Sequence, residues 1–209
     1  MPIISAKDIS CQRGNYPLFA SVSFQLDSTQ SLLISGPNGI GKTTLLESIA
    51  GLRTIQIGEL SFKGKDLAKY KDDWFEQSFY IGHKTGNKKE LNCLENLCSF
   101  LQIQGIEVSE QQAEDALEDV GLAGYEYQMA GSLSAGQKKR LALARLTLIN
   151  FPVWILDEPF VNLDVAGCDW LLKILKKHVN NKGLLIITAH DNKAIRQTVT
   201  QELVLESVE

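Results

Sequence analysis

One short segment constrains the fold of this 209-residue chain more than any other. Residues 36–43 fit the pattern G-x-x-x-x-G-K-[ST], with Thr44 next to it, between an apolar run at 31–35 and a helical pattern at 45–50. In such a loop the backbone N–H groups converge on phosphate oxygens, and the helix N-terminus adds positive potential. The pattern therefore predicts a strand, a phosphate-binding loop and a helix. The loop residues are Gly36, Pro37, Asn38, Gly39, Ile40, Gly41, Lys42, Thr43 and Thr44.

Two loop residues and two carboxylates further along the chain have the chemistry to act on a nucleoside triphosphate. Lys42 would reach the β- and γ-phosphates, and Thr43 would offer its hydroxyl to Mg²⁺. The apolar run 153–156 ends in Asp157 and Glu158. Asp157 would hold Mg²⁺, commonly through water, and Glu158 would orient and deprotonate the attacking water. Such an acidic pair alone is typical of a solvated turn, but after a phosphate loop we interpret it as catalytic.

Apolar runs followed by glycine-rich turns and helical patterns recur along the chain. This order is typical of an α/β fold with a mainly parallel sheet. The runs 31–35, 153–156 and 184–188 are continuous, as in strands that are buried on both faces. Residues 3–10 and 22–26 alternate more between apolar and polar side chains, which predicts an antiparallel flank.

Helical signals replace strand signals between residues 86 and 150. Asn92 with Glu95, and Ser109 with Gln112, have the spacing of capping boxes that begin helices. A helical segment therefore interrupts the α/β core. We predict one domain of the P-loop NTPase (RecA-like) class. Its catalytic core would comprise residues 1–85 and 151–209, and its helical subdomain residues 86–150.

Residues 133–137, Leu-Ser-Ala-Gly-Gln, resemble the LSGGQ signature of ABC ATPases, with alanine at the third position. Ser134 would cap the following helix, and Gly136 and Gln137 would let its N-terminus approach a second anion. Alone, this segment would be an ordinary capped helix. However, the phosphate loop, the signature, the acidic strand end and His190 follow one another in the order that this family has. The resemblance implies ATP and Mg²⁺ as cofactors, ATP hydrolysis, and a second copy of the chain paired head to tail.

Other site residues follow from the resemblance alone. Asp164 has the position of the acidic D-loop residue, and His190 that of the catalytic switch histidine, which contacts the γ-phosphate. Where the family has an aromatic residue on adenine, either Arg13 or Tyr16 would cover the base, since a guanidinium plane also stacks. His83 replaces a glutamine that contacts Mg²⁺ and water. It would act at the metal through water, act in coupling to a membrane partner, or fill a turn.

Within the ABC ATPases, segments 80–83, 94–97, 133–137 and 154–160 resemble the CcmA family of the cytochrome c maturation system. That resemblance implies membrane partners like CcmB, CcmC and CcmD, and a peripheral location on the cytoplasmic face of the inner membrane. It also implies hydrolysis linked to haem export or to release of the haem chaperone CcmE. The alternatives are the ATPase subunit of another ABC exporter and a soluble ABC ATPase acting on DNA or ribosomes.

Composition argues against several partner classes. The formal net charge of −4 provides no basic field to attract nucleic acid or anionic lipid. The four cysteines are scattered without a CxxC pair, so we expect neither a zinc site nor a disulfide framework, but a reducing compartment. The apolar runs are far shorter than the roughly 20 residues that cross a bilayer. We therefore expect no membrane span in this sequence.

Overall fold

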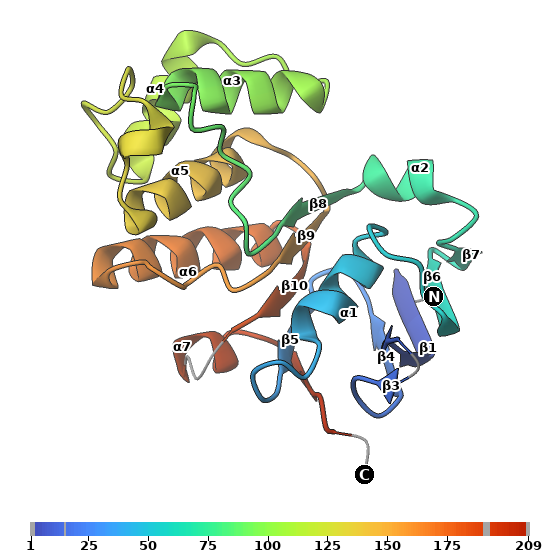
Figure 1. Ribbon diagram of the computed structural model, residues 1–209. Helices are drawn as coiled ribbons and strands as arrows, with labels where there is room; N and C mark the ends of the chain where they lie inside the picture. Colours follow the sequence, from blue (N-terminus) through green and yellow to red (C-terminus); the bar gives the residue numbers. More distant parts are fainter. Residues whose placement is uncertain (1–2, 15, 190–192, 208–209) are drawn as a thin grey trace. The chain divides into compact units, whose positions relative to one another are not determined.

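The computed structural model describes residues 3–14, 16–189 and 193–207 (Figure 1). The chain separates into two compact units. The α/β unit contains Met1–Gly82, Phe151–Glu158 and Leu175–Glu209. The helical unit contains His83–Asn150 and Pro159–Ile174. The helical unit thus includes residues 83–85 and 159–174 in addition to the segment 86–150 that the sequence indicated.

A five-stranded sheet forms the centre of the α/β unit, with strand order β11-β5-β10-β9-β8. All four strand pairs are parallel. Because parallel strands share one direction, their carboxyl ends meet at one edge of the sheet, where such folds bind ligands. Every residue of β5, β9 and β10 is buried, which confirms the three strands predicted from continuous apolar runs. The strands are β5 Ser31–Ser35, β8 Ser78–Ile81, β9 Val153–Leu156, β10 Leu184–Thr188 and β11 Gln201–Val204.

A second, antiparallel sheet in the same unit has the order β4-β1-β6-β7. Strand β4 alternates between buried and exposed residues, as expected for a sheet with one face in the core. The predicted antiparallel flank is therefore confirmed. A separate hairpin pairs β2 with β3. The strands are β1 Ile4–Ser10, β2 Gln12–Arg13, β3 Tyr16–Pro17, β4 Val22–Leu26, β6 Ile57–Phe62 and β7 Lys65–Asp66.

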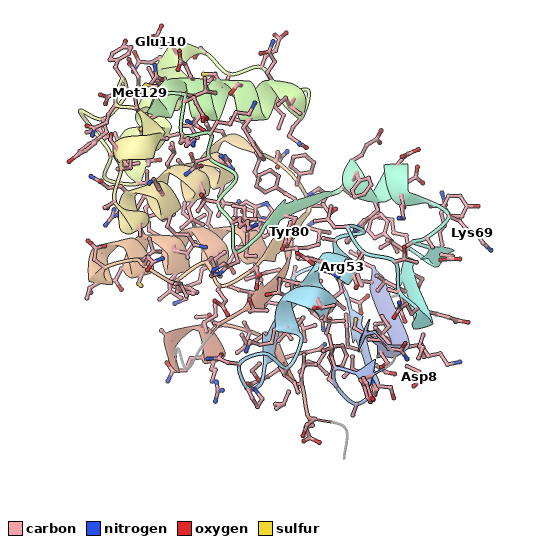
Figure 2. The ribbon with its side chains drawn as sticks, viewed as in Figure 1. Asp8, Arg53, Lys69, Tyr80, Glu110 and Met129 are labelled. Carbon is pink, nitrogen blue, oxygen red and sulfur yellow. The ribbon has the colours of Figure 1, made fainter. Side chains whose placement is uncertain are left out.

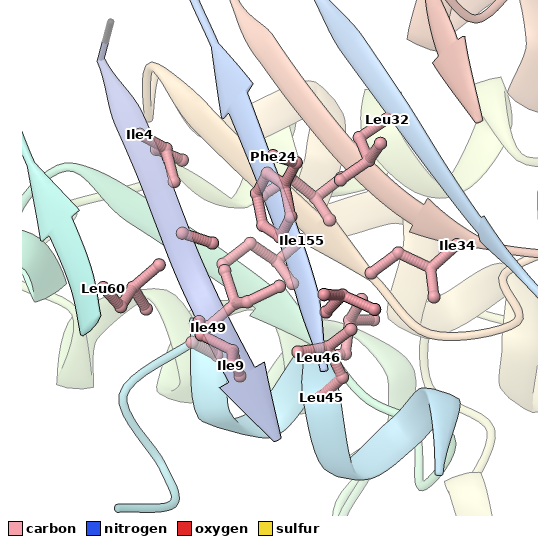
Figure 3. Packing of buried hydrophobic residues seen from close by; sticks show 14 of the residues in the cluster. Ile4, Ile9, Phe24, Leu32, Ile34, Leu45, Leu46, Ile49, Leu60 and Ile155 are labelled. Atoms are coloured by element: carbon pink, nitrogen blue, oxygen red, sulfur yellow. The ribbon is translucent and has the colours of Figure 1, made fainter. Parts of the chain in front are cut away.

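The core of the α/β unit joins both sheets through one helix. Helix α1 (Lys42–Ile49) contributes Leu45, Leu46 and Ile49, all fully buried. Figure 3 shows these side chains packed with Ile9 of the antiparallel sheet and Ile155 of the parallel sheet. Each buried leucine or isoleucine contributes about 1.5–3 kcal/mol of transfer free energy. This packing fixes α1, and so the start of α1 at the phosphate loop. The shorter helices are α2 Lys71–Phe75 and α7 Lys193–Arg196.

The helical unit has a core of its own. Both predicted capping boxes are present, at Asn92 and at Ser109. The first part of α6 belongs to this unit because Trp170 packs against its hydrophobic cluster. None of the described helices is long and apolar enough to cross a membrane. The helices are α3 Cys93–Ile103, α4 Glu110–Asp119, the 3₁₀ helix Ala130–Ser132, α5 Ala135–Leu148 and α6 Val165–Asn180, which ends in the α/β unit.

Candidate functional site

The loop between β5 and α1 has a backbone that depends on glycine. Gly36 and Gly41 have φ angles of 141° and 113°, a region that side chains rarely adopt. A Cβ atom on Gly36 would also lie 2.8 Å from the carbonyl oxygen of Leu205. Gly41 is the N-cap of α1, and no side chain caps this helix end within the described chain. The helix N-terminus is therefore available to an anion.

Lys42 is held over the phosphate loop although its side chain carries a charge. The residue is only 5% exposed. Its Nζ donates hydrogen bonds to the carbonyl oxygens of Gly36 at 2.8 Å and Pro37 at 3.1 Å. An ammonium has three donors, so it can add a phosphate oxygen without losing either bond. The loop thus positions a cation where the sequence places the β- and γ-phosphates.

Four side chains or backbone groups meet at the carboxyl ends of β9 and β10. The Thr43 hydroxyl donates to Asp157 Oδ2 at 2.8 Å, and the Thr188 hydroxyl donates to Asp157 Oδ1 at 2.7 Å. The backbone N–H of Glu158 donates to Thr188 Oγ1 at 2.8 Å. Asp157 and Thr188 are both 0% exposed. The structure therefore brings together Thr43, Asp157 and Glu158, which the sequence singled out, and adds Thr188.

These oxygen atoms fit a bound Mg²⁺. Mg²⁺ takes oxygen ligands and is usually held by one or two carboxylates together with substrate phosphates. The Thr43 hydroxyl donates a hydrogen bond to Asp157, which leaves its oxygen lone pairs available to a metal ion. Within the described residues, no group of three or more His, Cys, Asp and Glu side chains could hold a metal by itself. The arrangement suits a metal that arrives with a nucleotide.

Glu158 has an unusual backbone conformation. Its φ angle is 47°, in the left-handed region that non-glycine residues rarely adopt. The next residue is Pro159, and a residue before proline is further restricted to extended conformations. Strain of this kind, worth about 1–3 kcal/mol, tends to occur at functional sites. The strained turn lies where the sequence predicts the catalytic carboxylate.

Tyr80 of the neighbouring strand β8 was not predicted from the sequence to be a site residue. This residue of β8 is half-buried and packs against the core of the α/β unit, and Figure 2 labels it together with Arg53. Burial, followed by the negative charges of Asp157 and Glu47, raises the pKa of Tyr80 far above its ordinary value. Its phenol therefore remains neutral at physiological pH.

The signature segment lies in the helical unit and forms a capping box. The backbone N–H of Gln137 donates to Ser134 Oγ at 3.2 Å, and Ser134 N–H donates to Gln137 Oε1 at 2.9 Å. Ser134 is thus the predicted N-cap of α5. It is exposed, and its hydroxyl keeps a proton to donate to an anion. A Cβ atom on Gly136 would lie 2.7 Å from the carbonyl oxygen of Asn162, which explains the glycine there.

Asp164 is engaged within its own unit. Its Oδ1 accepts the backbone N–H of Gly167 at 2.9 Å and a hydrogen bond from Arg140. The Gly167 bond, followed by the contact with Arg140, lowers the pKa of the Asp164 carboxyl. The carboxylate thus holds the start of α6 beside α5. Its predicted role near nucleotide stays a prediction.

The contacts expected of Arg13, Tyr16, His83 and His190 stay predictions. Arg13 and Tyr16 face each other across the β2–β3 hairpin, and Tyr16 is 80% exposed. The side chain of Arg13 and the whole of His190 lie outside the described residues. His83 is exposed and begins the helical unit, and its metal and coupling roles stay predictions. One feature of the sequence could have indicated Thr188: it is a hydroxyl residue at the end of an apolar run, 184–188.

Comparisons with known proteins show the family of this chain. The ABC transporter family profile matches residues 19–161. The cytochrome c biogenesis ATP-binding export protein CcmA of Dechloromonas aromatica is 43% identical over 201 residues, which are 96% of this chain and 98% of that protein. CcmA of Hahella chejuensis is 42% identical over 189 residues, covering 90% of this chain and 89% of that protein.

Solved structures show the same fold. The ATP-binding cassette MJ0796, a dimer in a post-hydrolysis state bound to ADP and Pi, has a TM-score of 0.84 at 20% identity. The alignment covers 97% of this chain and 94% of that one. The family match and the full-length identities give the assignment. This chain belongs to the ABC transporter family, as an ATP-hydrolysing subunit of the CcmA type.

Proposed function

We propose that this chain hydrolyses ATP to drive a cytochrome c biogenesis export complex at the cytoplasmic face of the inner membrane. Membrane subunits of the CcmB type, with CcmC- and CcmD-like proteins, would be its partners. The full-length identity to CcmA proteins supports the choice of complex. The observation that carries the chemistry is the 2.8 Å hydrogen bond from Thr43 to Asp157, which joins the phosphate loop to the acidic strand end.

The residues of the α/β unit have separate roles in this proposal. Lys42 and the N-terminus of α1 bind the phosphates, and Thr43 and Asp157 hold Mg²⁺. When bound, Mg²⁺ neutralises the charge that develops on the β- and γ-phosphate oxygens. Glu158 orients the attacking water and accepts its proton. Because the transition-state charge is spread over several oxygens, positioning and fixed charges supply most of the catalysis.

A second copy of the chain completes each site. Two copies pair head to tail, so that Ser134, Gly136 and Gln137 of one copy approach the ATP held by the other. The exposed N-terminus of α5 supports this role because a helix N-terminus favours an anion, and the first turn of α5 contains no acidic residue. Hydrolysis removes the γ-phosphate that joins the copies. Opening of the pair then drives the membrane partner in haem export or in release of the haem chaperone.

The Glu158→Gln variant tests this proposal. Loss of a positioned general base should lower ATP turnover by about 10²- to 10⁴-fold while ATP binding persists. Cells that carry only this variant should lose holo-cytochromes c. Glu76→Gln, at an exposed carboxylate of the same unit, is the matched control and should change neither. Near-normal turnover would remove Glu158 from catalysis. Lost turnover with normal cytochromes c would assign the chain to another exporter.

A further inference from the structure

We infer that Thr188 is a positioning residue for ATP hydrolysis. Its single hydroxyl orients the Asp157 carboxylate and the Glu158 backbone together, so that metal binding and water activation depend on one atom. The inference rests on the proposed roles of those two carboxylates.

The first support is the hydrogen bonding of the Thr188 hydroxyl. It donates to Asp157 Oδ1 at 2.7 Å and accepts the backbone N–H of Glu158 at 2.8 Å. Serine, threonine and tyrosine hydroxyls are the side-chain groups that donate and accept readily through one oxygen atom, and only the first two are small enough here. Thr188 is 0% exposed, so water does not readily replace the hydroxyl. Both bonds are therefore lost together when the hydroxyl is removed.

The second support is the way Asp157 is held between two elements. Thr188 at the end of β10 contacts Oδ1, whereas Thr43 at the start of α1 contacts Oδ2. With a donor on each oxygen, the carboxylate plane is fixed relative to the phosphate loop. Mg²⁺ demands near-ideal octahedral geometry, so the binding of the metal is sensitive to rotation of this carboxylate. Mutation of a residue that orients a metal ligand in this way typically lowers metal affinity or activity by about 10- to 100-fold.

The third support is the strained backbone at Glu158. Its φ angle of 47° determines where the Cβ atom points, and so where the carboxylate lies. The hydrogen bond to Thr188 Oγ1 restrains that backbone at its N–H group. If the bond is removed, the residue can relax toward the extended conformation that proline favours in its predecessor. The carboxylate would then move away from the attacking water.

Strand register makes the arrangement rigid. Ile187 of β10 is paired with Leu156 of the adjacent parallel strand β9. Thr188 and Asp157 are the next residues on each strand, so the sheet itself sets their separation. A site on strands is held more precisely than one on loops. Thr188 thus joins the two carboxylate residues to the central parallel sheet of the α/β unit.

The test compares full-length Thr188→Val and Thr188→Ser with the native protein. The readouts are kcat for ATP and the Mg²⁺ concentration that gives half-maximal turnover. Valine keeps the shape and removes the hydroxyl, so kcat should fall and the half-maximal Mg²⁺ concentration rise, each by about 10-fold or more. Serine keeps the hydroxyl and should restore both values to within about threefold of native. Mg²⁺-free binding of ATP should be unchanged in both variants.

The matched control is Thr200→Val. The Thr200 hydroxyl likewise donates and accepts once, to the carbonyl oxygen and from the N–H group of Ser31, both at 2.9 Å. Ser31 begins β5, at the opposite edge of the sheet from the phosphate loop. This variant should keep the native kcat and Mg²⁺ dependence. If Thr188→Val does not fold, Thr188→Ala provides the same comparison without the hydroxyl.

Glu158→Gln is assayed alongside to separate the proposed role of Glu158 as the base from the positioning role of Thr188. Turnover retained in Glu158→Gln would show that the proposed base is wrong, whatever Thr188 does. Turnover lost in Glu158→Gln but native kcat and Mg²⁺ dependence in the variants without the Thr188 hydroxyl would overturn this inference alone. A defect in Thr188→Ser as large as in Thr188→Val would also overturn it, because the hydroxyl would not be the cause.

Discussion

At the scale of single residues, His178 shows how a side chain far along the sequence stabilises the strand that ends in Asp157. Its ring stacks on Trp154 of β9 at 3.8 Å between ring centroids, and its Nε2 lies 3.1 Å from the carbonyl oxygen of Leu184. A Cβ atom on Gly183 would lie 2.3 Å from two atoms of the ring, so only glycine leaves room for it. The imidazole therefore packs as a neutral aromatic group.

This packing predicts a dependence of stability on pH. Burial lowers the pKa of His178 below its ordinary value of 6.5, although the bond to Leu184 opposes the shift. Below about pH 6.5 the unfolded chain then binds more protons than the folded chain, so the free energy of unfolding decreases as the pH is lowered. The contribution is fully present above pH 6.5. Urea unfolding at pH 7.5 and 5.5 should show a smaller loss in His178→Phe than in the native protein. Equal losses would contradict the prediction.

The residues of the site differ in how far they could be predicted. Four residues could be predicted from sequence alone because they have fixed positions in local patterns: Lys42, Thr43, Asp157 and Glu158. Thr188 was missed because its role depends on the register between β10 and β9, which no local pattern reveals. Tyr80 and His178 were not singled out because their neighbours, such as Asp157 and Trp154, come from distant parts of the chain.

At the scale of elements, Arg145 of α5 holds residues 85–87 in place. This loop follows β8 along the chain and belongs to the helical unit. The residue is 2% exposed, and burial lowers the pKa of its guanidinium to about 10, so it is charged at neutral pH. It donates to the Thr85 carbonyl oxygen at 2.9 Å and to Asn87 Oδ1 at 2.8 Å, and it lies over the Phe100 ring. Its Nε has no hydrogen-bond partner in the described chain. The Thr85 carbonyl, the Asn87 amide and the Phe100 ring are all neutral groups.

Because the charge is buried among neutral groups, the conservative substitution should be the more harmful. Arg145→Lys keeps a buried charge and loses the planar fork that reaches both Thr85 and Asn87. Arg145→Met loses the same bonds but removes the charge. We expect Lys to cost about 3–5 kcal/mol of unfolding free energy and Met less, measured by urea denaturation. Native-like stability in Arg145→Lys, or a larger loss in Arg145→Met, would contradict this reasoning.

Elements with local signals were predicted well. The strands β5, β9 and β10 have the bounds expected from their apolar runs, and the capping boxes at Asn92 and Ser109 begin helices as expected. Contacts between distant segments were not predictable. Residues 159–174 join the helical unit because Trp170 packs on its core and Arg140 bonds to Asp164, 24 residues away. Neither contact can be predicted from the sequence of residues 159–174 alone.

At the scale of the whole molecule, the two units divide the chemistry of the proposed site. The α/β unit holds the phosphate loop and the acidic strand end, and the helical unit holds the signature segment. Lys42 and Glu158 should therefore act on ATP bound by their own chain. Ser134 should act on ATP bound by the other copy. Variants from the two groups should complement each other, whereas two variants from the first group should not.

Mixing two inactive proteins tests this division. Lys42→Ala loses the phosphate contact, and Ser134→Arg fills the space at the signature helix. In a one-to-one mixture, half of the pairs are mixed, and each mixed pair has one intact site, so turnover should recover to about a quarter of native. Lys42→Ala mixed with Glu158→Gln should recover nothing, because both changes affect the chain that binds the ATP. Two outcomes together would contradict the composite site: no recovery in the first mixture, and no ATP-dependent dimer of Glu158→Gln in gel filtration. Equal recovery in both mixtures would place Ser134 and Glu158 on the same ATP.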